Sequence, residues 1–419
     1  MVRWIALVGF LEKWKAIHIG LFYVAIRVLF FAFAPFDHYE LATDSYRVHE
    51  LVDQTLQGNF DYDIGRFIVA PLYPFFWASQ KWLFPNHWEL ALLFIQWLIQ
   101  AMGGIYLWRL GLMLFNKKVA ILTSLFYGLY PFAVLWSATF SSEAVFPSVF
   151  IGAIYFLVKS FQFNKWRDVI RSACFFSLSF LLKSHVLLFA PFVVIYFFTK
   201  KGHAFIALRH SLIYAAICLL FTLPYGIYSY KHYGVYVLSS NGAPFHFYTG
   251  NSEFGYRTVV EVPDQGSEDF MALQKMEFAR FNGPVHDSIM QLSQKEKQGL
   301  YADQARLWTK ENSGKFIEMK VYNAALFVLP GFSFRHYPLP TWLFSFLIML
   351  PIYIGAYFMI WKLRGIHRFM RGLFWSMALF AIVFYVQNRF RTLTLEPFYI
   401  LYATAFWFSR GDSFRPSES

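Results

Sequence analysis

The chain has 419 residues, of which 57% are hydrophobic, 22% are aromatic and only 15% are charged. A soluble domain averages about 25% charged residues, and a disordered chain has far fewer apolar ones, so the composition excludes both classes. The formal net charge of +12 does not indicate a nucleic-acid partner, because excess Lys and Arg in a membrane protein gathers in cytoplasmic loops beside anionic headgroups.

Apolar runs recur from residue 17 to residue 409, and Lys/Arg clusters or Pro/Gly turns bound each of them. Residues 1–15 form an interfacial lead-in, because their apolar stretch is too short to cross a bilayer. The pattern predicts an all-α polytopic membrane protein, a bundle of about 10–11 transmembrane helices in one domain, residues 1–419. The expected crossings are residues 17–35, 88–109, 119–140, 142–161, 169–182, 186–199, 207–228, 341–361, 372–387 and 397–409.

Residues 36–87 form the first predicted loop outside the bundle. Apolar residues recur at helical spacing between Asp44 and Gly58, so we expect a short helix that lies along the membrane surface. The next segment, residues 67–85, is apolar but contains three prolines. It either crosses the membrane as a further helix or forms a re-entrant hairpin.

The short loops predict how the bundle is oriented. Their basic residues fall on one side of the predicted crossings, and this side is expected to face the cytoplasm. These residues are Lys117, Lys118, Lys159, Lys165, Arg167, Arg171, Lys200, Lys201, Arg209, Lys362, Arg364, Arg368 and Arg371. The outward face then carries residues 36–87 and a long loop, residues 229–340, where apolar residues between charged ones indicate amphipathic helices.

Asp44 is the first candidate for chemistry. It follows the first crossing at the start of the predicted surface helix, and a helix N-terminus favours an ionised carboxylate. Such a carboxylate can act as a general base toward an incoming hydroxyl. The alternative is that Asp44 only caps the helix.

Glu143 is the second candidate, in a turn between two long apolar runs. A carboxylate at that depth is costly unless it is paired or faces a polar cavity, so it indicates a functional site. The alternative is a cap at the start of the next helix. An even number of predicted crossings separates Asp44 from Glu143, so both are expected on the outward face, where they can share a cavity.

Four cations at breaks between apolar runs form a third group, namely Arg66, Lys183, Arg389 and Arg391. If they converge on the outward face, they are suited to hold a phosphate, which Arg binds as a bidentate fork and Lys as a point charge. The alternative is that each side chain snorkels to lipid headgroups. The sequence contains no Gly-rich phosphate loop, zinc-binding His/Glu spacing or Gly-x-Ser-x-Gly elbow.

These segments, taken in order, resemble the GT-C type membrane glycosyltransferases, in particular the glycosyltransferase 39 group related to protein mannosyltransferases and lipid A aminoarabinose transferases. The resemblance extends over about 350 residues and depends on the order of its motifs. They are Thr43-Asp44-Ser45-Tyr46, Ala70-Pro71-Leu72-Tyr73-Pro74, Ser142-Glu143-Ala144-Val145-Phe146, Leu181-Leu182-Lys183-Ser184, Ser239-Ser240-Asn241-Gly242, Tyr248-Thr249-Gly250-Asn251 and the run from Arg389 to Pro397.

The resemblance implies an inverting transfer from a polyprenyl-phosphate sugar. Asp44 is then the base that takes the proton of the acceptor hydroxyl, the hydroxyl attacks the anomeric carbon, and polyprenyl phosphate leaves. Cations stabilise the departing phosphate, with Arg391 expected first for this task, before Arg66 and Lys183. The expected substrate-binding residues are Glu143, Arg66, Tyr73, Lys183, Asn241, Arg389 and Arg391.

Three features depart from the family pattern. Asp44 is followed by Ser45, where many relatives have a second acidic residue, and Val69 stands where some relatives have a lysine. The sequence ends at Ser419 without the soluble C-terminal domain of some relatives. We therefore expect a lipid or a growing glycan as the acceptor more than a protein.

The predicted function is the transfer of a sugar from a polyprenyl-phosphate carrier to a hydroxyl of a lipid, glycan or protein on the outer face of the membrane. The resemblance implies a bacterial cytoplasmic membrane, with an archaeal or endoplasmic-reticulum membrane as the alternatives. It implies no metal requirement, although Asp44 and Glu143 offer carboxylate ligands for a divalent cation. Cys174 and Cys218 lie inside apolar runs and predict neither a disulfide framework nor a cysteine-rich metal site. Two alternatives stay open: a lipid-linked-oligosaccharide transporter or polymerase, and a non-catalytic scaffold.

Overall fold

A computed structural model of the chain describes residues 14–33, 44–64, 67–199, 204–261, 291–332, 338–385 and 388–409. Within these residues the secondary structure is helical, apart from an isolated antiparallel bridge between Asp63 and Ile68. The predicted all-α fold class is therefore confirmed. Most of the predicted lead-in, residues 1–13, lies outside the described residues.

Helices occupy the apolar segments that the sequence predicts as crossings. They are α2 (Ala16–Phe33), α5 (Trp88–Leu114), α6 (Lys117–Gly128), α8 (Phe146–Phe163), α9 (Trp166–Leu182), α10 (Ala190–Phe198), α11 (Ala204–Tyr233), α18 (Leu339–Lys362), α19 (Arg368–Val383) and α21 (Glu396–Phe408). Among the described residues, six helical stretches are long and apolar enough to cross a membrane, and they contain α2, α5, α8, α11, α18 and α19.

The segment 119–140 does not form one continuous helix. α6 ends at Gly128, and a short helix, α7 (Pro131–Trp136), begins three residues later. Pro131 has no backbone N–H to continue the helix, and its ring holds Tyr130 in an extended conformation with φ −63° and ψ 118°. This break starts the irregular stretch that leads into the turn at Glu143.

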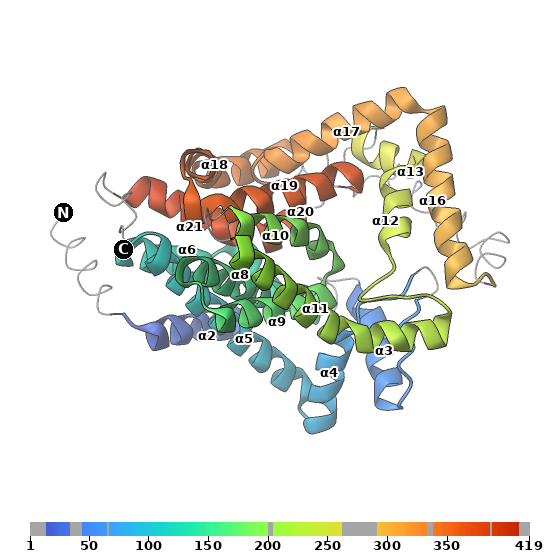
Figure 1. The fold of residues 1–419 in the computed structure, drawn as a ribbon, viewed down its shortest axis with the longest axis horizontal. Coiled ribbons are helices and arrows are strands. Elements are labelled where there is room, and N and C mark those ends of the chain that lie inside the picture. The colour runs from blue at the N-terminus through green and yellow to red at the C-terminus, as the bar shows by residue number, and fades with distance from the viewer. Residues whose placement is uncertain are drawn as a thin grey trace.

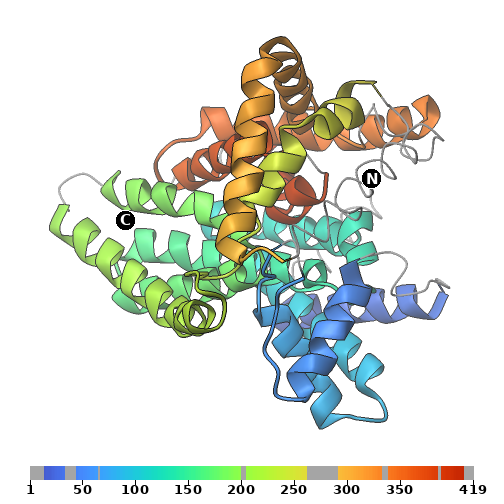
Figure 2. The same cartoon turned by 90° about the vertical axis from the view of Figure 1, so that its right-hand side faces the viewer.

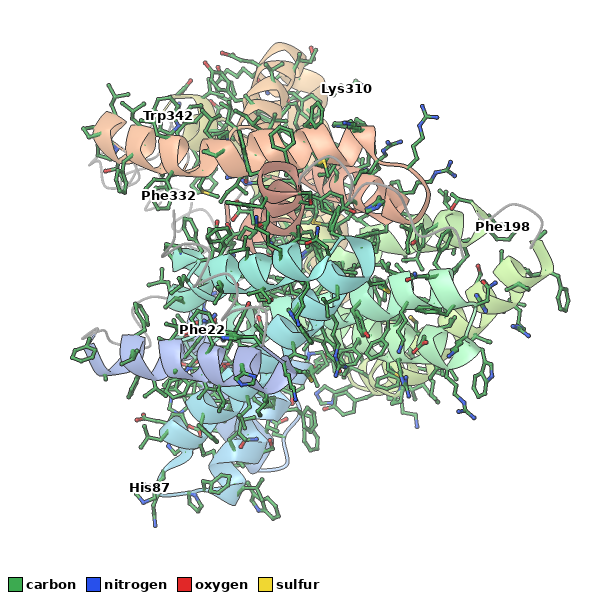
Figure 3. All side chains as sticks on the ribbon, turned by 90° about the vertical axis from the view of Figure 1, so that its left-hand side faces the viewer. Phe22, His87, Phe198, Lys310, Phe332 and Trp342 are labelled. Atoms are coloured by element: carbon green, nitrogen blue, oxygen red, sulfur yellow. The ribbon has the colours of Figure 1, made fainter. Side chains whose placement is uncertain are left out.

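The core of the bundle is built around α8, whose apolar stretch is 89% buried. α8 packs against α5 and α9, and Phe156 of α8 contacts Tyr106 of α5 and Phe175 of α9. By contrast, only 17% of the apolar stretch is buried in α2, and the same share is buried in α11. These two helices therefore turn apolar side chains outward. α10 does the same at its end, where Phe198, labelled in Figure 3, is 48% exposed. An outward apolar face of this kind suits contact with lipid.

A second group of helices covers one end of the bundle, at the right of Figure 1. These are α3 (Asp44–Leu56), α4 (Leu72–Leu83), α12 (Ala243–Gly250), α13 (Glu253–Tyr256), α16 (Gln294–Glu311) and α17 (Ser313–Val328), with a π-helical turn, Arg257–Glu261, after α13. Seen from that end, α16 lies over α12 (Figure 2), and the two helices are in contact. Both predicted loops are thus partly helical within the described residues.

The helix α3 has the bounds that its apolar spacing predicts, and Gly58 follows it with a φ of +80° that favours glycine. The proline-containing segment 67–85 forms α4, which has 12 residues. At 1.5 Å per residue this helix is about 18 Å long, too short to cross about 30 Å of hydrocarbon. α4 packs against α3 and α5 and therefore acts as part of the cover over the bundle end.

Close packing between α5 and α8 depends on Gly103. A Cβ atom at this position would lie 2.7 Å from the Ser148 Cα atom, so Gly103→Ala is expected to lower the free energy of unfolding by about 1–3 kcal/mol through overpacking. Gly299→Ala in α16 is the matched control, because a Cβ there meets no atom within 4 Å. It is expected to raise stability by about 0.5–1 kcal/mol. Thermal unfolding in detergent measures both, and equal midpoints for the two variants would contradict the packing argument.

Candidate functional site

A cavity of about 350 Å³ opens between the helices that cover the bundle end and the bundle itself. Its walls come from segments far apart in the sequence: α3, α4, the turn at Glu143, the break after α9, α12 and α20 (Asn388–Thr394). The polar and charged residues on these walls are Arg47, Tyr73, Ser141, Ser142, Glu143, Lys183, Ser184, His185, Ser240, His246, Tyr385 and Arg389. The cavity is large enough for a sugar and a phosphate.

Three of the predicted residues meet at the back of this cavity. Glu143 lies in the 3-10 turn Ser142–Ala144, and its Oε1 atom is 2.7 Å from Lys183 Nζ and 3.3 Å from Arg389 Nη1. The Glu143 side chain is only 6% exposed, whereas those of Lys183 and Arg389 are 21% and 31% exposed. The carboxylate therefore lies behind two cations that reach the cavity. One buried negative charge holds two positive ones together, which leaves a net positive surface.

The break that carries Lys183 is extended backbone between α9 and the 3-10 helix Ser184–Phe189, with φ −147° and ψ 107°. This interruption directs Lys183 toward Glu143 instead of leaving it on a continuous helix. His185, two residues on, packs among aromatic rings, and its Nε2 atom is 3.3 Å from Thr394 Oγ1. The turn predicted around Lys183 is therefore present.

The turn that carries Glu143 is held by polar side chains from α5. Gln96 Nε2 donates to the Thr139 carbonyl at 3.3 Å, and Gln100 Nε2 donates to the Ala144 carbonyl at 2.9 Å. Trp97 Nε1 also donates, to the carbonyl of residue 137 at 3.2 Å. Backbone carbonyls outside regular helix need such partners within an apolar bundle.

Gln100 also accepts a hydrogen bond from the buried guanidinium of Arg27, at 2.9 Å, and Arg27 donates to the Gly128 carbonyl at 2.6 Å. Arg27, a charged residue inside α2, thus supports the same turn through Gln100. Arg27 is 1% exposed and lies over the Tyr23 ring at 4.9 Å. These contacts give this buried cation polar partners, which its burial requires.

Asp44 is the first residue of α3. The side chain of Asp44 and the whole of Arg66 lie outside the described residues. Three residues of α3, namely Arg47, Val48 and Leu51, line the cavity. Positions three and four apart share one face of a helix, so position 44 is on the face of α3 that carries Arg47 and Val48. The expected approach of Asp44 and Glu143 stays a prediction, and the placement of α3 favours it.

Tyr73 lines the cavity, and its hydroxyl donates to Gln96 Oε1 at 2.8 Å, while its expected role in substrate binding stays a prediction. Three further lining residues, Arg47, His246 and Tyr385, are absent from the sequence prediction. The Tyr385 hydroxyl and His246 Nδ1 are 3.5 Å apart. Arg47 has a signal in the sequence, because it follows Asp44 by one helical turn. His246 has none, since only the folding of the long loop brings α12 to the cavity.

Asn241 lies outside the lining of the cavity, contrary to its expected role in substrate binding. Its Oδ1 atom accepts from the Ile68 backbone N–H at 2.6 Å, and its Nδ2 atom donates to Gln294 Oε1 at 3.1 Å. Gln294 in turn donates to Asp63 at 2.5 Å. Asn241 therefore ties the first loop to α16 and holds the cover of the cavity together.

Arg391 was expected to be the leading phosphate ligand, and the structure corrects this expectation. Its side chain is 4% exposed, and it donates to the carbonyls of Leu326, Phe327 and Leu329 at 2.5–3.1 Å and to that of Gly331 at 2.8 Å. It therefore satisfies the carbonyls at the end of α17. Its Nε atom lies 3.2 Å from Glu396 Oε1.

Glu396 completes a buried cluster with Arg391. The hydroxyl of Tyr353 donates to Glu396 Oε1 at 2.6 Å, and the hydroxyl of Tyr130 donates to Glu396 Oε2. Tyr353 also supports the cation, because the guanidinium carbon lies 5.1 Å from the centre of its ring. The cluster joins α17, α18, α20 and α21, so its role is to hold the fold.

Arg391→Met tests this assignment. The substitution leaves Glu396 buried without its cation and uncovers the carbonyls at the end of α17, so the free energy of unfolding is expected to fall by about 3–5 kcal/mol. Thermal unfolding in detergent measures the change as a lower midpoint. An unchanged midpoint with weakened use of a lipid-phosphate donor would instead restore the phosphate role.

No group of three or more His, Cys, Asp or Glu side chains gathers among the described residues. On the cavity, Glu143 is already paired with two cations. Two cations beside a carboxylate oppose the approach of a divalent cation, because like charges repel. The arrangement suits an anion better than a metal, and phosphate is one of the anions that Arg and Lys bind.

Residues 69–228 match the family model for dolichyl-phosphate-mannose-protein mannosyltransferases. The matched segment contains Tyr73, Glu143 and Lys183, and it ends before α12 and α20. No curated protein matches the chain significantly.

Two solved structures have a similar fold. One is the oligosaccharyltransferase AglB from Archaeoglobus fulgidus in complex with an inhibitory peptide and a dolichol-phosphate, with a TM-score of 0.52 and 14% identity. The other is an Archaeoglobus fulgidus oligosaccharyltransferase in the apo form, with a TM-score of 0.55 and 14% identity. The matches cover 93% and 94% of this chain but only 49% and 50% of those chains, so this chain spans about half their length. The fold and the family match together confirm the predicted resemblance to GT-C type membrane glycosyltransferases of the protein mannosyltransferase group.

Proposed function

We propose that this chain transfers a sugar from a polyprenyl-phosphate carrier to a hydroxyl of a lipid, glycan or protein acceptor, with the cavity as the active site. The fold and the family match support glycosyl transfer at a membrane. The proposal of a polyprenyl-phosphate donor depends on one observation: Lys183 and Arg389 both contact Glu143 on the cavity wall. A lipid-linked donor carries a phosphate, and two held cations suit it.

In the proposed reaction, the acceptor hydroxyl loses its proton to the Asp44 carboxylate. Its oxygen forms a bond to the anomeric carbon as the bond from that carbon to the phosphate oxygen breaks. The electron pair of the broken bond leaves with polyprenyl phosphate, and the configuration at the anomeric carbon inverts. Asp44 later releases its proton to water. General-base help of this kind is worth roughly 10²–10⁴-fold in rate.

Lys183 and Arg389 stabilise the negative charge that grows on the phosphate as it leaves. Both are partly exposed to the cavity, and Glu143 holds them in place before the donor arrives, so little reorganisation is needed during the reaction. Arg389 can bind two phosphate oxygens, while Lys183 supplies a point charge. Arg66 stays in the proposal as an expected third cation.

A second cavity, of about 320 Å³, supports a lipid-linked substrate. Its lining is apolar and includes Phe60, Phe75, Phe221 and Tyr228. The segment 69–75 separates the two cavities: Val69, Ala70, Tyr73 and Pro74 line the polar one, whereas Pro71, Leu72 and Phe75 line the apolar one. An isoprenoid tail placed in the apolar cavity keeps its phosphate within reach of the polar one.

We further propose that the cavity faces outward from a bacterial cytoplasmic membrane. The basic loops predict the cytoplasmic side, and α3 and α12 lie at the far end of the bundle from α6 and α21 (Figure 1). An active site on the outer face suits a polyprenyl-phosphate donor, because a soluble nucleotide-sugar donor is confined to the cytoplasm.

Mass spectrometry of lipids, lipid-linked glycans and surface glycans tests the proposal in cells with and without the protein. The protein is expected to add one sugar increment to an acceptor, and polyprenyl-phosphate sugar is expected to accumulate without it. The mass of the increment then identifies the sugar class. Accumulation of a finished lipid-linked glycan on the inner face, with no missing increment, would contradict transfer and favour a transporter.

A further inference from the structure

The segment from residue 137 to residue 144 leads into the 3-10 turn that carries Glu143, and four of its carbonyls accept hydrogen bonds from side chains. Three of the donors, at positions 96, 97 and 100, come from α5. The fourth is Ser45 of α3, whose Oγ atom donates to the Phe140 carbonyl at 2.9 Å. Phe140 lies three residues before Glu143.

Ser45 is 0% exposed and is the second residue of α3, directly after Asp44. Its hydrogen bond therefore joins the first turn of α3 to the turn that carries Glu143. The two segments are 95 residues apart in the sequence. Because the bond lies at the N-terminus of α3, a change in its length moves the start of that helix relative to Glu143.

We infer that Ser45 is a positioning residue, whose hydrogen bond to the Phe140 carbonyl sets the start of α3, and with it Asp44, relative to Glu143 and the two cations that Glu143 holds. The inference rests on the proposed function, since it assigns to Ser45 the placing of the proposed base. A general base works only within about 2.6–3.2 Å of the proton that it takes, so a small shift of α3 matters.

The same hydrogen bond explains why a serine, and not a second acidic residue, suits the position after Asp44. An ionised carboxylate is an acceptor only and has no proton to donate to a carbonyl. At a position that is 0% exposed, its charge would also lie unpaired beside the Phe140 carbonyl oxygen. In this chain, position 45 therefore requires a small donor.

Ser45→Ala removes the donor and keeps the small size of the side chain. We expect kcat to fall roughly 10- to 100-fold, the cost of a misplaced reacting group, while KM for polyprenyl-phosphate sugar stays unchanged because the phosphate ligands are untouched. Ser45→Thr retains the hydroxyl and is expected to recover most of the loss. Initial rates with the purified protein in detergent give kcat and KM for each variant.

Thr55→Ala is the matched control, because Thr55 is another buried hydroxyl on α3. Its Oγ1 atom donates to the Leu51 carbonyl of the same helix at 2.7 Å and reaches no part of the Glu143 turn. Thr55→Ala is expected to lower the unfolding midpoint as much as Ser45→Ala does and to leave kcat unchanged. If kcat follows the midpoint in the same way in both variants, Ser45 has only a structural role and the inference is overturned.

Two further outcomes separate this inference from the proposed function. An inactive Asp44→Asn together with a fully active Ser45→Ala overturns the inference alone. A fully active Asp44→Asn overturns the assignment of the base, whatever Ser45→Ala does. If Ser45→Ala does not fold, Ser45→Cys replaces it, with the same expectation because a thiol is a weak donor. Failure of both variants to fold makes Ser45 a structural residue and also overturns the inference.

Discussion

Asp44→Asn is expected to lower kcat for sugar transfer by roughly 10²–10⁴-fold, the contribution of a general base. Asparagine has nearly the size of aspartate but cannot take a proton from the acceptor hydroxyl. It is also as good as aspartate at a helix N-terminus, so α3 is expected to form normally. The measurement is kcat with polyprenyl-phosphate sugar, alongside the unfolding midpoint of each protein in detergent.

Asp53→Asn is the matched control on the same helix. The Asp53 side chain is 48% exposed and pairs with Lys81 at 2.6 Å, and an exposed pair contributes only about 0–1 kcal/mol. We therefore expect normal kcat and nearly normal stability. If Asp44→Asn instead loses folded protein while the remaining molecules keep their kcat, Asp44 is a helix cap and not the base.

The second large effect is expected when either cation of the site is removed. Lys183→Ala and Arg389→Ala should each lower kcat by roughly 10²–10³-fold, because each removes a preorganised charge from the leaving phosphate. Glu143 keeps one partner in each variant, so it is not left as an unpaired buried charge. Arg389→Lys keeps the charge but loses the bidentate fork, and its kcat is expected to lie between those of wild type and Arg389→Ala.

Lys81→Ala is the control for a general loss of positive charge at the end of the bundle that holds the cavity. Lys81 pairs with Asp53 and lies over the Trp88 ring, and it is not among the residues that line the cavity. We expect its kcat to equal that of wild type. Lowered unfolding midpoints with normal kcat in Lys183→Ala and Arg389→Ala would make the pair with Glu143 a structural feature and would remove both residues from the proposed mechanism.

Much of the fold follows from the sequence, because an apolar environment leaves the backbone few choices. Long apolar runs must form helices, since only a helix satisfies its own hydrogen bonds in lipid. Interruptions in these runs predict the breaks, as at Lys183, and the spacing of apolar residues predicts α3. The predicted crossing 119–140 was too long, because the helix is interrupted before Pro131. The effect of Pro131 on the backbone is local, so this interruption could have been predicted from the sequence.

The sequence alone also identified Glu143 and Lys183 as candidates, because a charge inside an apolar run must find a partner. It did not identify the partners. Glu143 contacts Lys183, which is 40 residues away in the sequence, and Arg389, which is 246 residues away. Contacts over such separations arise only when the helices pack. The roles of Ser45, His246 and Asn241 depend on the same packing.

Arg389 and Arg391 show most directly what tertiary structure adds. The two arginines have the same chemistry and lie in one short helix, and the resemblance alone led us to expect Arg391 as the leading phosphate ligand. Residues that are two apart in the sequence point about 200° apart around an α-helix. One arginine side chain therefore faces the cavity, and the other faces the end of α17. The sequence by itself determined that this is a helical membrane protein with charges at its breaks. The rotation of α20 against its neighbours decided which of the two arginines faces the cavity, because only packing fixes that rotation.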